Sequence, residues 1–380
     1  MFIKKIHISN YRNIVEEKVE FSSKLNCICG DNGQGKTNLL DAIHYLSMTK
    51  SFVQSSDAFV KNFDADQMSV VGQFEGLADD VVDKIVIALP KDSSKVIKKN
   101  DKTYNRMIDH IGRYPLVCVS PFDTALVQES GEERRRFLNM LLSQIDRDYL
   151  VDLQAYNKLL AQRNKLLKSE NSSRLLLEVV SEQISPIGDR IAKKRVELVV
   201  RLAEYLGHYY SLVSGSNEKV LMEYKSELTT DGVAMADLLK NSLQKDLIVG
   251  HTTSGIHRDD LSLSISLKIG EEITWTSLRK CGSQGQQKSF LVALKLSQFA
   301  IMREIYGGPP MLLLDDVFDK LDSKRVENLI DIVSTEDFGQ IFITDSNKVR
   351  LDALVSHKKV DNLFFTVKEG KIALEGGDNA

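Results

Sequence analysis

The sequence predicts an α/β fold that is interrupted by a largely helical insertion, and three observations lead to this prediction. Strand-like alternation of apolar and polar residues fills the first 120 residues and returns from about Leu247. A glycine-rich loop follows one apolar strand, and an apolar run at 311–314 ends in two aspartates. Residues 131–212, in contrast, contain almost no glycine or proline and are rich in Leu, Arg, Lys and Glu. We therefore predict a discontinuous head, 1–120 and 246–380, with an inserted helical arm lobe at 121–245.

The N-terminal part of the chain is predicted to be mainly strands. Even spacing of Phe2, Ile6 and Ile8 indicates a first strand, and two more are expected at 15–21 and 25–29. Leucines and isoleucines between 39 and 46 then recur at helical spacing. Further strands are predicted at 68–74, 84–89 and 116–119, and the run 83–106 is typical of a β-meander with polar turns.

The middle of the chain is predicted to form long helices. Apolar residues recur every seven positions in two sets, with a turn candidate at 169–173 between them. The two sets are Leu153, Leu160 and Leu167, and Ile191, Leu198 and Tyr205. An antiparallel helical arm fits this pattern, and a helix of about 20 residues would extend about 30 Å. Two or three heptads are few for a coiled coil, so ordinary helix packing within a lobe remains an alternative.

Alternation of strands and helices returns in the last third. A strand at 261–267 is expected to pair with one at 269–275, and a helix at 289–305 follows. A buried strand at 311–314, a helix at 323–334 and a strand at 340–344 complete the pattern. This order of elements is α/β again.

Composition restricts the class of protein. The chain has 50 basic and 53 acidic residues and a formal charge of −3, so any nucleic-acid surface must be a local patch. The first residues alternate instead of forming a secretory apolar block, and no apolar run approaches the roughly 20 residues that span a bilayer. The four cysteines lack metal-binding spacing, and Cys27 and Cys29 are expected to pack as small apolar residues. We expect a reducing cytoplasmic location.

Residues 30–37 match the phosphate-binding pattern Gly-x-x-x-x-Gly-Lys-Thr in full. Glycines let the backbone curl so that successive N–H groups point at phosphate oxygens, and the start of the following helix adds its dipole. Lys36 would reach the β- and γ-phosphates, with a part in catalysis, and the Thr37 hydroxyl would hold Mg²⁺. The sequence thus predicts ATP and Mg²⁺ as cofactors. The predicted nucleotide contacts in this loop are Gly30, Asp31, Asn32, Gly33, Gln34, Gly35, Lys36, Thr37 and Asn38.

A second site candidate is the acidic pair at the end of the apolar run 311–314. A buried parallel strand delivers its last residues to the carboxyl edge of the sheet, where ligands bind in such folds. Asp315 is placed to hold Mg²⁺, directly or through water. Asp316 could polarise the attacking water as a general base.

A third motif, Ser283-x-Gly285-Gln286, comes directly before an apolar-periodic helix. Alone it is weak, since an ordinary N-capped helix explains it better. Here, however, the motifs follow one another in the order glycine loop, Ser-x-Gly-Gln, and Asp-Asp with Leu321-Asp322 after it. Motifs in this order define the ABC-type ATPases. In that class the serine motif of one subunit closes on the γ-phosphate held by the other. We therefore predict that Ser283, Gly285 and Gln286 contact the nucleotide of a second copy, that Ser283 is catalytic, and that ATP drives a homodimer.

Over essentially its whole length the chain resembles the RecF family of bacterial recombination-repair ATPases, which are related to SMC heads. The matching stretches are 7–13, 27–46, 120–138, 252–261, 282–296 and 312–322. Ile256, Asn139 and the pair Asp319-Lys320 depart from the family pattern, and the last change affects the loop that would communicate between subunits.

This resemblance implies an SMC/RecF-like ABC ATPase head and a repair function. Such a protein dimerises on ATP, clamps duplex DNA near single-strand gaps and helps to load RecA together with RecO and RecR. Its ATP hydrolysis is expected to be weak, slow and stimulated by DNA, and to act as a switch. The protein is expected in the cytoplasm, associated with the nucleoid. Another SMC-like DNA-repair ATPase head is the open alternative. A transport ATPase conflicts with the long helical insertion between Lys36 and Ser283.

Three further groups of residues each have two interpretations. Arg12 resembles the arginine that SMC-like heads place near the nucleotide, although a surface cation is the alternative. The cluster His257-Arg258-Asp259-Asp260 could suggest a metal site, but we expect its charges to pair with each other. The basic runs 134–136 and 193–195 are either DNA-phosphate contacts or solvated faces.

Overall fold

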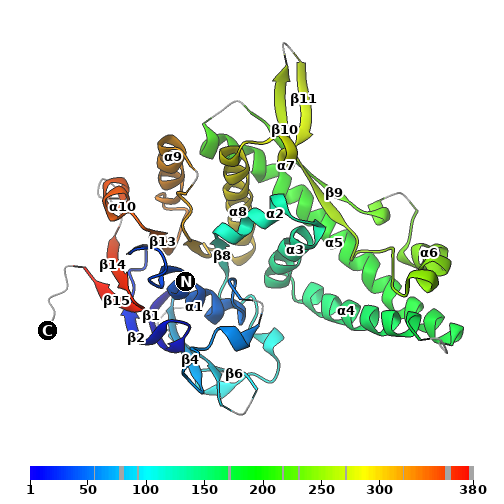
Figure 1. Cartoon of the computed structure of the whole chain (residues 1–380), viewed down its shortest axis with the longest axis horizontal. Coiled ribbons are helices and arrows are strands. Elements are labelled where there is room, and N and C mark those ends of the chain that lie inside the picture. The colour runs from blue at the N-terminus through cyan, green and yellow to red at the C-terminus, as the bar shows by residue number, and fades with distance from the viewer. Residues whose placement is uncertain are drawn as a thin grey trace. The chain divides into compact units, whose positions relative to one another are not determined.

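The computed structural model describes residues 1–375 apart from 55, 77–80, 92–93, 170–172, 216–217, 230–231, 270–271, 320 and 356–360. The chain forms two compact units (Figure 1). The first comprises Met1–Asp123, Tyr209–Ser216 and Lys288–Ala380, and the second Thr124–His208 and Asn217–Gln287. Residues 246–287, which the sequence assigns to the head, thus share the second unit with the helical segment, because their strands pair there.

The first unit contains an antiparallel sheet in the order β2-β1-β4-β5-β6-β7. Alternation produces it directly: every second residue of β4 is buried, so one face of the strand packs on the core. The predicted strands at 68–74 and 84–89 and the meander are therefore confirmed. The strands are β1 (Phe2–Tyr11), β2 (Ile14–Glu20), β4 (Met68–Glu75), β5 (Asp83–Leu89), β6 (Val96–Lys99) and β7 (Lys102–Thr103).

A second sheet in the same unit has the order β15-β14-β3-β13-β12-β8 and is parallel except for β15. Its central strands are buried on both faces, which explains their continuous apolar sequences. The register aligns Cys29 with Asp345, so the carboxyl ends of β3 and β13 meet at one edge. The strands are β3 (Leu25–Cys29), β8 (Leu116–Val119), β12 (Met311–Leu314), β13 (Ile341–Asp345), β14 (Asn362–Lys368) and β15 (Lys371–Leu374).

Helix α1 (Lys36–Met48) contacts strands of both sheets and shares one apolar core with them. The later helices are α9 (Ser323–Val333), with Asp322 as its N-cap, and α10 (Lys348–Val355). The long helix α8 (Gln284–Tyr306) begins before the expected 289. Short 3₁₀ turns lie at Asp57–Phe59, Met107–Asp109 and Pro121–Thr124.

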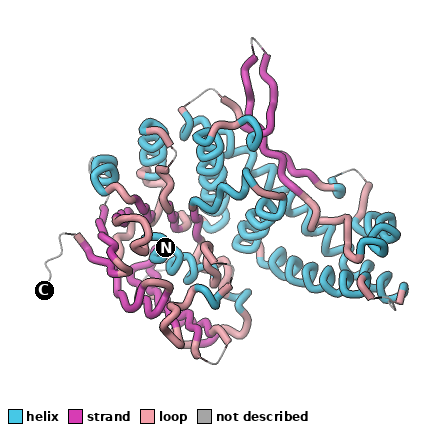
Figure 2. Tube along the Cα trace, viewed as in Figure 1, coloured by secondary structure: helices cyan, strands magenta, loops and turns pink. Residues whose placement is uncertain are grey.

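The second unit is mainly helical (Figure 2). Its helices are α2 (Ala125–Gln128), α3 (Gly131–Ile145), α4 (Arg147–Leu167), α6 (Met235–Val249), α7 (Leu278–Cys281) and most of α5 (Arg174–Ser214). Helices α4 and α5 are antiparallel, because residue numbers in α5 fall as their partners' numbers in α4 rise. The pairs are Tyr149–Arg195, Asp152–Arg190 and Arg163–Ser181. Part of the predicted turn, 170–172, lies outside the described residues.

A three-stranded antiparallel sheet, β11-β10-β9, completes the second unit. The strands are β9 (Val220–Lys225), β10 (Asp260–Ile269) and β11 (Glu272–Ser277), and a 3₁₀ turn lies at Glu227–Thr229. The predicted pairing of 261–267 with 269–275 is confirmed as the β10–β11 pair. Nowhere in the described part of the chain is a helix both long and apolar enough to cross a membrane.

Candidate functional site

The glycine-rich loop leaves β3 at the carboxyl edge of the parallel sheet. Gly30, Gly33 and Gly35 all have positive φ angles, of 151°, 81° and 117°, which side-chain-bearing residues rarely adopt. A Cβ on Gly30 would also lie 2.3 Å from the carbonyl oxygen of Val367 in β14. Backbone conformation thus favours glycine at all three positions, and close packing requires it at Gly30 as well.

Two segments far away in the sequence hold the loop in place. Asn13, in the turn between β1 and β2, donates to the Gln34 carbonyl at 3.0 Å and accepts from Asn38 at 2.6 Å. In the turn between β14 and β15, the N–H of Gly370 donates to the same carbonyl at 2.8 Å, and the N–H of Glu369 donates to Gln34 Oε1 at 2.6 Å. The loop is therefore fixed before any ligand binds. No local motif in the sequence indicated these contacts.

Lys36 spans the loop from the first turn of α1. Its side chain is buried, and Nζ donates to the carbonyl oxygens of Gly30 at 2.7 Å and Asp31 at 3.2 Å. The N-cap of α1, Gly35, provides no side-chain hydrogen bond, so the first N–H groups of the helix lack a side-chain cap. Asp31, Asn32 and Gly33 form the exposed tip. This cradle of N–H groups and one cation fits a polyphosphate.

Thr37 and Asp315 form the candidate magnesium site. Thr37 Oγ1 donates to the Asp315 carboxylate, 3.1 and 3.0 Å from its two oxygens, and Thr344 Oγ1 donates to it at 2.8 Å. Asp315 is only 1% exposed, and burial raises its pKa to about 6. Asp315 forms no ion pair with the other described residues, and a buried carboxylate next to a hydroxyl is the oxygen donor set that Mg²⁺ prefers. The residues therefore fit the predicted ion.

Asp316 follows in a strained conformation, with a φ of +44°, and its N–H donates to Thr344 Oγ1 at 2.9 Å. Burial raises the pKa of its carboxyl group, and the nearby charge of Lys36 opposes this rise. Thr344 therefore bonds both to the carboxylate of Asp315 and to the backbone of Asp316, a role that sequence reasoning missed.

One further carboxylate at this edge, Asp345, is buried and neutralised by Arg350 through two hydrogen bonds of 2.8 and 2.7 Å. The Arg350 guanidinium also lies 5.5 Å from the ring centre of Phe318. Within the described residues no group of three or more His, Cys, Asp or Glu side chains forms a metal cluster.

Arg12 lies in the turn after β1 and is held by its backbone. Its φ is +53°, its N–H donates to Val60 at 2.8 Å, and its carbonyl accepts from Asn62 at 2.7 Å. The Nη1 atom of its guanidinium is buried and has no hydrogen-bond partner among the described residues. Since a buried cationic nitrogen without a partner is costly, it fits an anionic ligand. The nucleotide contact predicted for Arg12 stays a prediction.

Ser283, in the second unit, is the exposed residue directly before α8. Its N–H donates to Gln286 Oε1 at 2.7 Å, and the Gln286 N–H donates to Ser283 Oγ at 3.2 Å, which is a reciprocal capping box. Gln286 is also held by Glu218 through a bond of 2.7 Å. Gly285 lies in the first turn of the helix. The motif thus presents an ordered helix start, and its contact with a second nucleotide remains a prediction.

The cluster at 257–260 pairs with the helices instead of with itself, so the predicted internal pairing is wrong. Asp260 accepts two bonds from Arg134, at 2.6 and 3.0 Å, and Asp259 lies 3.4 Å from Arg195. His257 contacts Tyr156 Oη at 2.9 Å. Each partner lies far away in the sequence, which is why spacing did not identify it.

These contacts also separate the two basic runs into buried and exposed members. Arg195 is 2% exposed and bonds to Asn139 at 2.9 Å, and Arg134 is nearly buried, so both are structural. Arg136 and Lys193 are exposed and remain candidates for phosphate contact. Of the divergent pair 319–320, residue 320 lies outside the described residues.

Comparisons with known proteins place this site in a family context. Residues 1–178 match the family model of the AAA ATPase domain. The chain is 42% identical over 372 residues to the DNA replication and repair protein RecF of Parabacteroides distasonis, covering 98% of this chain and 99% of the relative. The corresponding protein of Bacteroides thetaiotaomicron is 39% identical over 379 residues, with 100% of both chains covered.

Solved structures agree with these relatives. The structure of the recombination mediator protein RecF-ATP in the RecFOR pathway has a TM-score of 0.85 and 32% identity, and the match covers 98% of this chain and 97% of that one. An Smc head bound to the C-winged helix domain of ScpA has a TM-score of 0.59 at 14% identity, covering 98% of this chain and 97% of that one, so it shows a shared fold alone.

Proposed function

This chain belongs to the RecF family, and from that premise we propose that it is an ATP-dependent DNA-repair protein that dimerises on ATP and clamps duplex DNA near single-strand gaps. Together with RecO and RecR it would help to load RecA, and slow ATP hydrolysis would release it. A cytoplasmic, nucleoid-associated location follows from this role.

The observation that carries the proposal is the meeting of the glycine loop and the acidic pair at one edge of the parallel sheet. Thr37, from the start of α1, and Asp315, from the end of β12, lie 3.0 Å apart at their closest oxygens although 278 positions separate them in the sequence. Gly30 and Lys36 complete the same edge. This arrangement binds a nucleoside triphosphate with its metal, because cradle, cation and carboxylate all lie within one site.

Each residue at this edge would have a separate part in the reaction. Mg²⁺ held by Thr37 and Asp315 would supply charge neutralisation at the phosphates. Lys36 would turn from the loop carbonyls to phosphate oxygens. Asp316, whose pKa is raised, is the candidate base that orients and deprotonates the attacking water. We expect slow turnover, because an aspartate reaches one methylene less far toward that water than a glutamate.

Dimerisation would complete the site. Ser283 of a second copy, with Gly285 and Gln286 in the same helix start, would contact the γ-phosphate through its hydroxyl and nearby N–H groups. Binding energy from both nucleotides would then hold two chains around DNA, and hydrolysis would remove the contact. ATP would thus serve as a reversible fastener.

The test is the mass of the protein in solution with and without ATP, repeated with gapped and with blunt duplex DNA. We expect an ATP-dependent dimer that is retained best on gapped DNA. Lys36→Met should abolish ATP-induced dimerisation. Ser283→Arg should keep nucleotide binding and lose the dimer. A wild-type monomer that ignores both ATP and DNA would refute the clamp, and a Ser283→Arg protein that still dimerised would refute the composite site.

A further inference from the structure

A pocket lies at one end of the second unit, where α4 ends, α5 begins and α6 ends. It is partly open to solvent, and its volume is about 490 Å³. Its lining combines leucines with two cations, and includes Leu167, Lys168, Arg174, Leu177, Leu243 and Leu247. This volume lies within the roughly 300–1,000 Å³ that is usual for ligand pockets, so it can take one or two bulky apolar groups.

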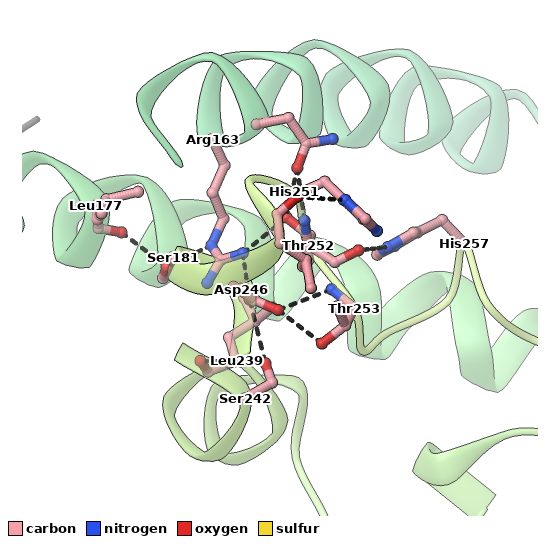
Figure 3. Close-up of polar contacts among 12 residues, drawn as sticks. Arg163, Leu177, Ser181, Leu239, Ser242, Asp246, His251, Thr252, Thr253 and His257 are labelled. Carbon is pink, nitrogen blue, oxygen red and sulfur yellow. Dashed lines mark hydrogen bonds and ion pairs between the residues drawn. The ribbon is translucent and has the colours of Figure 1, made fainter. Parts of the chain in front are cut away.

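A buried polar network links the three helices that border the pocket (Figure 3). Arg163, one turn before the end of α4, donates to Ser181 of α5 at 3.1 Å and to Asp246 of α6 at 2.8 Å. Both partners of the Arg163–Asp246 pair are fully buried. Thr253 donates two further bonds to Asp246, of 2.9 and 2.7 Å. Because one network links all three helices, it fixes the helices whose ends border the pocket.

Apolar surface continues outward from the pocket. Ile248 on α6 is 84% exposed, and Leu175 and Leu176 on α5 are 67% and 52% exposed. Single exposed apolar residues are normal, but these three directly adjoin pocket-lining residues in the sequence (Arg174 and Leu247), and apolar surface gathered beside a pocket is of the kind that marks interaction sites. We call the pocket and these three residues the arm-end surface.

The charge of the arm-end surface is positive although the whole chain carries −3. Lys168 lines the pocket and forms no ion pair within the described part of the chain, and Arg174 has only a loose, exposed contact of 3.8 Å with Glu178. Lys165 and Lys245, exposed on α4 and α6, add to this charge. A partner complementary to it must present carboxylates beside bulky apolar side chains.

We propose that the arm-end surface docks an acidic, leucine- or phenylalanine-bearing segment of a partner protein. An apolar side chain enters the leucine-lined pocket, and adjacent carboxylates pair with Lys168 and Arg174. The exposed Ile248 and Leu175 extend the contact beyond the pocket, which a single small molecule would not need. DNA would use the cations but would gain little from this apolar area. The inference does not depend on the nucleotide site.

The test uses a fluorescein-labelled synthetic peptide in which glutamate and leucine alternate. Its binding to the full chain is measured by fluorescence anisotropy. We expect saturable binding, weakened about tenfold by the double change Lys168→Glu/Arg174→Glu and about as much by Ile248→Ser. A peptide with serine for leucine should not bind. All three substituted residues are exposed, so circular dichroism should show unchanged folding.

Matched control variants lie on the same helix. Lys193→Glu and Val200→Ser change exposed residues of α5 that start about 28 Å along the helix from Arg174, and both should leave binding unchanged. Equal losses in these controls, or no binding to the wild type, would overturn the proposal. The proposal would also be overturned if the charge-reversal variant weakened binding of duplex DNA but not of the peptide, since the surface would then bind DNA. Self-association of the wild type that Ile248→Ser removes would overturn it too, since the surface would then bind a second copy of the chain.

Discussion

His110 should make the first unit sensitive to mild acid. The side chain is fully buried, Nε2 lies 2.7 Å from the Leu46 carbonyl, and Nδ1 is buried without a hydrogen-bond partner among the described residues. Burial lowers the pKa of His110 from 6.5 to about 4, and the nearby cations Arg113 and Lys99 act in the same direction. Protonation therefore favours the unfolded chain.

The magnitude follows from linkage. The folded pKa lies below the unfolded one, so the stability is fully present above pH 6.5 and is lost as the pH falls toward 4. Between about pH 7.5 and pH 5 the free energy of unfolding should fall by about 2 kcal/mol through His110 alone. In His110→Phe this loss should disappear, although the missing bond to Leu46 costs about 1 kcal/mol at every pH.

The assay is hydrogen exchange in increasing denaturant, followed by peptide mass spectrometry, because this reports the first unit separately from the second. Wild type, His110→Phe and His110→Gln are compared at both pH values. For each protein, the loss in free energy of unfolding between the two pH values is measured, and the variant's loss is subtracted from that of the wild type. The contributions of other buried groups such as His44 are the same in both proteins and therefore cancel. Equal losses in wild type and both variants would refute the reasoning.

Three further predictions test the site and the basic runs. Gly35→Ala should weaken ATP binding in calorimetry far more than Gly33→Ala, because its Cβ would lie 2.8 Å from the Asn13 side chain, whereas Gly33 has nothing within 4 Å. Arg195→Ala should lower the free energy of unfolding by about 3–5 kcal/mol, because it leaves Asp259 buried without its partner. Arg136→Ala should leave the free energy of unfolding unchanged, because Arg136 is exposed. It should reduce the salt dependence of DNA binding by about one phosphate contact. Asp316→Glu should change turnover with little effect on ATP affinity, and unchanged turnover would exclude Asp316 as the base.

Sequence reasoning located the glycine loop and the acidic pair because each is contiguous and each follows a buried strand of a recognisable pattern. It could not locate Asn13 or Gly370, whose contacts with the loop depend on the turns between β1 and β2 and between β14 and β15. Thr344 was missed for the same reason, since only the pairing of β12 with β13 brings its hydroxyl to Asp315.

In the helical segment, too, the sequence pattern predicted the helices but not their long-range polar contacts. Heptad spacing predicted long antiparallel helices, and Leu167, Ile191 and Leu198 are indeed buried. The buried pair Arg163–Asp246, however, joins residues 83 positions apart, and charged residues in a helix-rich sequence usually face solvent. Periodicity identifies the packed face of a helix, but not which polar residue enters it.

Several strained or buried groups of the first unit lie at the edge where the nucleotide is expected. Gly30 and Gly35 adopt positive φ, Asp316 does so without being glycine, and Asp315 is buried with a pKa raised to about 6. Local rules are usually broken where function requires it, and the surrounding structure must then hold the strained groups in place. Here the Asn13 contact and the Thr344 hydroxyl do so. A bound cation and polyphosphate would relieve the buried charge at the same edge, so ligand binding and stabilisation of this unit should occur together.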